Sequence, residues 1–109
     1  MSEKMTPFQA GELAGNEADV PMDAFEMSQR HDDFIIGYIV GYSEMESFRQ
    51  ARPSVAAMTA GELGYRYNAP FNTLLPHMGF DAELRKEMAK AYAVAAKTAA
   101  EEGEDDDNP

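Results

Sequence analysis

The chain of 109 residues contains no cysteine, which excludes disulfide bonds, zinc sites built on thiolates and cysteine nucleophiles. No segment shows the alternation of apolar and polar residues that is typical of a half-buried strand. The phosphate-binding patterns GxGxxG and GxxxxGK[ST] are missing as well. A chain of this length has room for one domain with a working core, and none for a separate catalytic domain.

Hydrophobic runs long enough to cross a membrane are also missing. A span needs about 20 mainly apolar residues, whereas the most apolar run, "FIIGYIVGY" at residues 34–42, lies between Asp33 and Glu44. The first residues, "MSEKMTPFQAGELAG", lack the basic start and apolar core of a signal peptide. We therefore expect a cytoplasmic protein that does not associate with membranes.

Helix signals begin near the start of the chain. Thr6 and Pro7 form a cap and first-turn pair for a short helix that ends near residue 16. From about residue 23 to residue 48 there is no proline and no turn cluster. This stretch predicts one long helix with the run "FIIGYIVGY" at its centre.

The second half of the chain predicts two more helices. Ser54 or Thr59 can cap a third helix, which ends where Asn68 takes a left-handed conformation. A segment bounded by two prolines follows and has room for one or two helical turns. Asp81 caps the last helix, whose apolar residues repeat at the spacing of one buried stripe.

These signals together predict an all-α fold. We expect a compact bundle of about four helices, formed by residues 1–100, around a central helix that carries a stripe of glycines. Residues 101–109, "EEGEDDDNP", are a run of like charges that cannot bury apolar surface. We expect this acidic tail to be disordered.

The glycine stripe needs a structural explanation. Gly37 and Gly41 lie one above the other on a helix, and each costs roughly 1 kcal/mol relative to alanine. A second helix that crosses closely over this bare surface would offset the cost through dispersion contacts. Two segments offer matching glycines, namely the first helix with Gly11 and Gly15 and the third helix with Gly61 and Gly64.

Three pieces of the chain carry a resemblance to a known family. The pieces "QAGELAG", "DDFIIGYIVGYS" and "AAMTAGELGYRYN" occur in an order and spacing that resemble a family of small uncharacterised bacterial proteins. Members of that family have glycine-spaced helices and a centre similar to GYxxGY. The likeness covers roughly residues 9–68 and implies a compact helical domain, but it implies no activity.

Charge is distributed unevenly along the chain. Residues 1–48 carry a net charge of −8, residues 49–100 carry +3, and the tail carries −6. Acidic residues on the first two predicted helices can form one continuous face, and three of them share a stripe on the long helix at spacings near whole turns. These three are Glu26, Asp33 and Glu44, and the others near them in sequence are Glu12, Glu17, Asp19 and Asp23.

This acidic face leads to our preferred hypothesis of function. Carboxylates on a rigid scaffold can occupy a nucleic-acid-binding groove of a partner protein by competing with phosphates for its lysines and arginines. We therefore predict a non-enzymatic inhibitor or accessory protein, encoded by a phage or mobile element, that binds a basic surface. The negative charge argues against direct nucleic-acid binding. A face that only keeps the protein soluble remains the simpler interpretation.

Two further interpretations stay open, and the sequence leaves the oligomeric state open too. Tyr65, Arg66 and Tyr67 could bind a small ligand or nucleotide by stacking and charge, or Tyr65 or Tyr67 could pack into the core. The chain could also be a structural subunit. No catalytic residues, metal site or cofactor are predicted, because His31 has only His77 as a second histidine and no carboxylate pair stands out.

Overall fold

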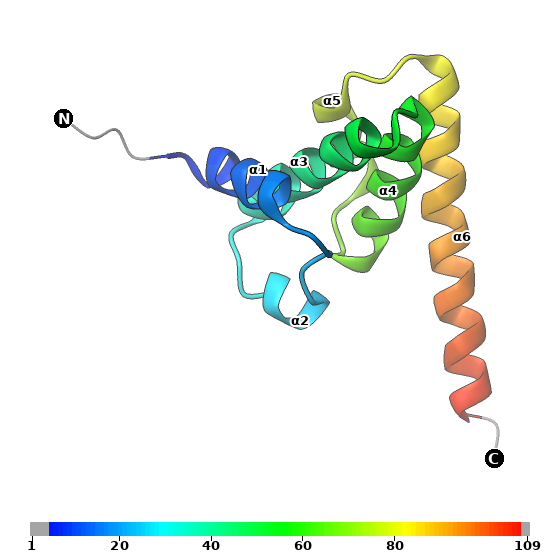
Figure 1. The fold of residues 1–109 in the computed structure, drawn as a ribbon. Coiled ribbons are helices and arrows are strands. Elements are labelled where there is room, and N and C mark those ends of the chain that lie inside the picture. The colour runs from blue at the N-terminus through cyan, green and yellow to red at the C-terminus, as the bar shows by residue number, and fades with distance from the viewer. Residues whose placement is uncertain (1–4, 108–109) are drawn as a thin grey trace.

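The computed structural model describes the backbone of residues 5–107 and the side chains of residues 5–101. The described backbone is all helical and contains no strand, which confirms the predicted fold class (Figure 1). Two of the six helices are short, so the prediction of about four main helices also holds. The helices are α1 (Pro7–Glu17), α2 (Ala24–Met27), α3 (Asp32–Gln50), α4 (Pro53–Arg66), α5 (Phe71–Met78) and α6 (Ala82–Asp107).

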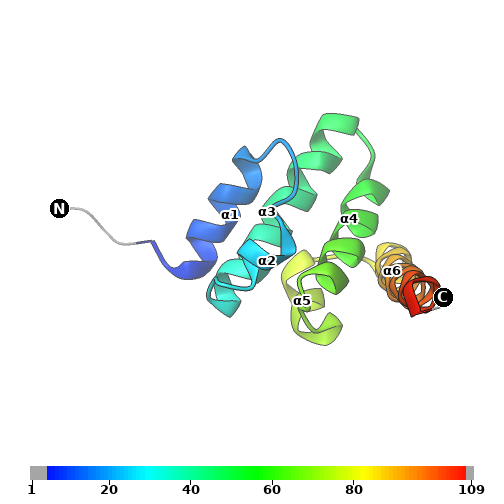
Figure 2. The same ribbon diagram turned by 90° about the horizontal axis from the view of Figure 1, so that it is seen from below.

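The four longer helices lie side by side in the order α1, α3, α4, α6 (Figure 2). The short helices α2 and α5 lie on opposite sides of α3 in Figure 1. Helix α3 is buried continuously from Ile35 to Ser43, because α1 packs on one flank and α4 on the other. The run "FIIGYIVGY" is therefore the central helix of the bundle, as the sequence predicted.

The predicted long helix at residues 23–48 is wrong at its start. The segment forms two helices, α2 and α3, separated by a turn. The Asp23 carboxylate accepts the Phe25 N–H at 2.7 Å and caps α2, while Nδ1 of His31 accepts the Asp33 N–H at 3.0 Å and caps α3. Two side-chain caps this close together, with the side chain of Met27 fully buried between them, favour a turn over a continuous helix.

Three of the predicted helix boundaries are confirmed. At the start of α1, Thr6 forms a capping box with Gln9: each backbone N–H is bound by the other side chain, at 3.0 and 3.1 Å. Asn68 has a φ of 60° just after α4, which is the left-handed conformation expected there. Asp81 caps α6 through its carboxylate, which accepts the Leu84 N–H at 2.9 Å.

The predicted caps of the third helix are wrong. Helix α4 begins at Pro53, before both Ser54 and Thr59, and Arg52 at its N-cap makes no side-chain cap bond. Proline needs no hydrogen bond for its missing N–H and already has a helical φ, so it starts the helix without a polar cap.

The C-terminal end of the domain stays a prediction. Helix α6 continues to Asp107, past the predicted end of the domain at residue 100. The side chains of residues 102–109 and the backbone of residues 108–109 lie outside the described residues. Disorder of the acidic tail therefore stays a prediction.

Candidate functional site

Helices α1 and α3 cross with their backbones in direct contact. A Cβ atom built on any of the four glycines at the crossing would lie less than 3.0 Å from a backbone atom of the other helix. The contacts are reciprocal and rise in the same order along both helices, which therefore run parallel. Gly11 and Gly15 face the carbonyls of Phe34 and Tyr38, and Gly37 and Gly41 face those of Phe8 and Glu12.

This crossing decides which helix covers the glycine stripe of α3. The sequence left the first and third predicted helices as alternatives, and the structure shows that α1 is the partner. Because peptide groups rather than flexible side chains form the contact, α1 and α3 are held at one separation. The pair is therefore a rigid platform for the acidic side chains on its surface.

Two of the predicted acidic residues meet at this crossing. Glu12 on α1 and Glu44 on α3 lie close enough for the Glu12 charge to act on Glu44. Partial burial, and then the charge of Glu12, raise the pKa of the Glu44 carboxyl above its ordinary value. The crossing thus brings negative charges together, and this arrangement lowers the stability of the fold near neutral pH.

The single acidic stripe predicted for one long helix is wrong. Glu26 lies on α2 and forms an ion pair with Arg30 at 3.5 Å, so it shares no helix with Asp33 and Glu44. The remaining predicted residues are exposed on α1, on α3 or on the segment between α1 and α2. They are Glu17, Asp19, Asp23 and Asp33.

The charge of this half of the molecule is nevertheless strongly negative. Residues 5–51 hold nine acidic and two basic side chains. Both basic side chains are engaged locally, Arg30 with Glu26 and Arg49 with Glu46 at 2.8 Å. We refer to the surface of α1, α2 and α3 that carries the predicted residues as the acidic face.

The alternative ligand site does not assemble as predicted. Tyr67 is buried at 6% exposure, and its hydroxyl donates a hydrogen bond to the Met22 carbonyl at 2.6 Å. Burial raises the pKa of Tyr67, so the hydroxyl stays neutral in its core position. Tyr65 and Arg66 remain at the surface, so only two of the three residues are available to a ligand.

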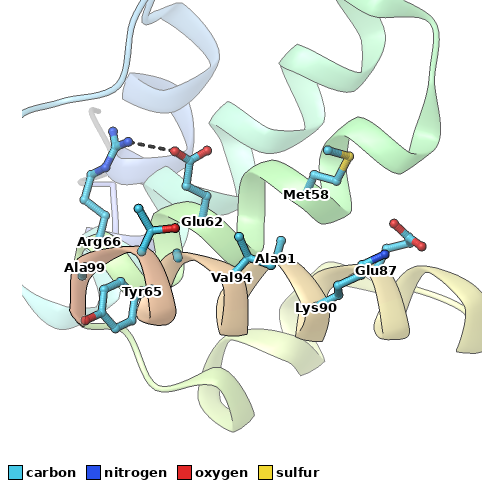
Figure 3. Close-up of a pocket in the computed structure, with 11 residues that line it drawn as sticks. Met58, Glu62, Tyr65, Arg66, Glu87, Lys90, Ala91, Val94 and Ala99 are labelled. Atoms are coloured by element: carbon cyan, nitrogen blue, oxygen red, sulfur yellow. Dashed lines mark hydrogen bonds and ion pairs between the residues drawn. The ribbon is translucent and has the colours of Figure 1, made fainter. Parts of the chain in front are cut away.

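A groove between α4 and α6 was not predicted from the sequence. Its volume is about 770 Å³, and its walls combine exposed apolar side chains with charges of both signs (Figure 3). Arg66 and Glu62 form an ion pair at 3.0 Å on one wall. The lining residues are Met58, Glu62, Tyr65, Arg66, Glu87, Lys90, Ala91, Val94, Ala95, Thr98 and Ala99.

One sequence signal could have indicated this groove. The apolar stripe of the last helix continues through Ala95, although the third helix is much shorter than the last. When a helix is longer than the helix that it packs against, part of its apolar stripe stays exposed. In the groove itself, Val94 of α6 is 55% exposed and Met58 of α4 is 52% exposed.

The histidines take structural positions in the described part of the chain. His31 caps α3, and the ring of His77 lies 5.2 Å from the ring of Phe8. Among the described residues, no group of three or more histidine, aspartate or glutamate side chains is placed to hold a metal ion. Within the same residues, none of the helices has the length and apolar character that a membrane span requires.

Comparison with known proteins gives a family and no function. No curated protein and no solved structure matches the chain. Residues 4–95 match a family described as "Protein of unknown function (DUF2623)", a match that extends beyond the residues on which the sequence resemblance rested. A bacterial source and a shared GYxxGY-like centre stay predictions. The chain belongs to this family of uncharacterised proteins.

Proposed function

We propose that this protein is a non-enzymatic interaction protein whose acidic face binds a basic surface of a partner protein. The observation that carries the proposal is the concentration of unneutralised carboxylates on the rigid α1–α3 pair, where the charge of Glu12 acts on Glu44 across the crossing. A structure that holds two like charges together gives up stability for the arrangement. A surface that only had to be soluble would gain by separating them.

The rigid crossing suits this function in a second way. Carboxylates on a fixed scaffold keep their spacing when a partner approaches, so little conformational entropy is lost on binding. A partner that normally binds phosphates would present lysines and arginines to them. The protein would then act as an inhibitor or accessory factor by occupying a nucleic-acid-binding site, in the manner of proteins encoded by phages and mobile elements.

The test is a binding experiment with the protein immobilised as bait. Proteins retained from a cell lysate at low salt are eluted in two parallel arms, one with duplex DNA and one with about 0.5 M salt, which screens charges over a few ångströms. We expect the same protein to be eluted in both arms. Its association rate with the bait, measured by surface plasmon resonance, should fall as ionic strength rises.

A matched pair of variants then locates the surface. The double variant E17K/E44K reverses two exposed charges of the acidic face, whereas E62K/E83K makes the same change in net charge on α4 and α6. We expect a large loss of association rate in the first variant and little change in the second. Equal losses would show a response to net charge alone, and retention that duplex DNA cannot displace would contradict competition for a nucleic-acid site.

A further inference from the structure

Helix α6 extends well beyond the helix that it packs against. Its 26 residues correspond to about 39 Å of helix, whereas the 14 residues of α4 correspond to about 21 Å. Figure 1 shows α6 continuing past the end of α4 toward the C-terminus. The described part of the chain therefore supplies no neighbour for the last turns of α6, beyond Ala99.

The groove between α4 and α6 runs alongside α4 and reaches Thr98 and Ala99 on α6. Val94 is 55% exposed in this groove, and the small residues Ala95 and Ala99 lie along the same wall, four residues apart. Small side chains let a second helix approach closely, and exposed apolar ones gain by being covered. The shape and chemistry of the groove suit a helix.

The distribution of charged residues along α6 indicates which helix could occupy the groove. Its first half carries Arg85, Lys86 and Lys90 against Glu83 and Glu87, a net charge of +1, and its last turns carry six acidic residues between positions 101 and 107. A helix with one basic and one acidic half is complementary to a copy of itself in the antiparallel direction. A parallel copy would place like charges together.

We propose that a second copy of this chain occupies the groove through its own α6, packed antiparallel about a two-fold axis between Ala95 and Ala96. This axis places Lys90 opposite Glu101 of the partner subunit, twice in each dimer. Lys90 and Glu101 are eleven residues apart, close to three full turns, so both lie on the helix side that carries Val94. Glu101 and Lys90 are both exposed in the single chain and free to make this contact.

The same axis brings two further basic residues to the levels of acidic positions. Arg85 and Lys86 fall at the levels of positions 106 and 105 of the second copy, which are both aspartates in the sequence. Glu87 falls at the level of position 104, a glutamate, and Lys97 falls at the level of Val94, so neither has an opposite charge across the axis. The balance still favours the antiparallel register. The interface is isologous, as two-fold dimers require.

Sedimentation equilibrium over a range of protein concentrations tests this proposal. The wild type should show a monomer–dimer equilibrium, and each single reversal, K90E or E101K, should weaken the dimer on the order of tenfold or more because two attractive pairs become repulsive. The double variant K90E/E101K should recover the wild-type dissociation constant. The control R52E makes the same charge change as K90E at an exposed site next to α4 and should leave the equilibrium unchanged.

Each alternative outcome is decisive. A wild type that is monomeric at every concentration would overturn the proposal, and binding of a small apolar dye by that monomer would assign the groove to a ligand instead. A dimer that K90E and E101K leave unchanged, or that the double variant fails to restore, would overturn the antiparallel register. The variants carry normal far-UV circular dichroism if only the association is altered. None of these results bears on the acidic face, which lies on other helices.

Discussion

Two parallel helix pairs of this molecule, α1 with α3 and α4 with α6, share the sequence AGEL but pack differently. In the first pair both helices contribute glycines, and every built Cβ would strike the backbone of the other helix. In the second pair only α4 contributes them. A Cβ built on Gly61 would lie 2.5 Å from the Met88 carbonyl oxygen, whereas the atoms nearest to a Cβ built on Gly64 are side-chain atoms of Leu74 and Tyr92.

The two pairs show that the short motif AGEL can take part in two kinds of helix packing. Backbone contact on both sides gives the α1–α3 pair a single separation, which holds the carboxylates of the acidic face in place. In the α4–α6 pair, side chains form part of the contact and can adjust their positions. The same two helices also line a groove. Glu12 and Glu62 occupy the same position of the motif. The charge of Glu12 acts on Glu44 of the neighbouring helix, whereas Glu62 forms its ion pair with Arg66 of its own helix.

The largest expected effect comes from filling the first crossing. Replacing both Gly37 and Gly41 with leucine should abolish cooperative folding or lower the melting temperature strongly. Each side chain would be forced against the backbone of α1, and overpacking costs about 1–3 kcal/mol per site. Thermal unfolding followed by circular dichroism measures the change. An unchanged melting temperature would show that α1 can leave α3 without cost to the fold.

A subtler pair of substitutions tests the asymmetry within the second crossing. Gly61→Ala should destabilise the protein, because the new methyl group would meet the Met88 carbonyl at 2.5 Å and the Ala91 Cβ at 2.8 Å. Gly64→Ala should be neutral or slightly stabilising, since its methyl would meet only side-chain atoms at 3.0 Å or more and alanine gains about 1 kcal/mol in a helix. Denaturant unfolding of both variants gives the two free energies. Equal losses would contradict the one-sided packing.

The connections that join each pair are anchored by tyrosine hydroxyls of unequal burial. Tyr67 donates to the Met22 carbonyl at 2.6 Å, and the less buried Tyr92 donates to the Ala69 carbonyl at 3.2 Å. Tyr67→Phe should cost about 1–2 kcal/mol, because it leaves a partly buried carbonyl without its donor, and Tyr92→Phe should cost less. Denaturant unfolding of both variants measures this order, and a larger cost for Tyr92→Phe would contradict it.

Much of the fold was predictable from local sequence signals. The cap at Thr6, the left-handed Asn68 and the cap at Asp81 each depend on residues within one turn of the helix end, and all three are confirmed. The break between α2 and α3 was not predicted. It depends on the burial of Met27 and on His31 acting as a cap, and His31 resembles an ordinary helical residue in the sequence.

The candidate sites were less predictable, because they depend on contacts between distant segments. The acidic residues were found, but their arrangement required knowing that α1 crosses α3 at Glu12 and Glu44. The sequence leaves Tyr67 either as a ligand contact or as a core residue. The bond to Met22 that fixes it in the core joins residues far apart in the chain. The groove is lined by residues of α4 and α6 that are far apart in the chain, so only the packing of the two helices forms it.

The smallest expected effect concerns the carboxyl groups of Glu12 and Glu44 in the α1–α3 pair. The raised pKa of Glu44 means that the native state favours the protonated form more than the unfolded chain does. Protonation of Glu44 makes its full contribution to the free energy of unfolding at pH values below the pKa of Glu44 in the unfolded chain. This contribution is lost as the pH rises through the higher pKa of Glu44 in the native state. Glu44→Gln should therefore raise the melting temperature above that of the wild type near neutral pH, and the gain should shrink as the pH falls toward about 4.

A second substitution separates the two causes of this shift. In an E12Q background the benefit of Glu44→Gln near neutral pH should be smaller, because the repulsion from Glu12 is already gone. It should not vanish, because burial is the larger cause of the raised pKa. Melting temperatures of the four proteins of this cycle at several pH values measure the coupling between the two carboxylates. A benefit that is independent of pH, or of Glu12, would mean that the tight crossing of α1 and α3 does not hold the two charges together.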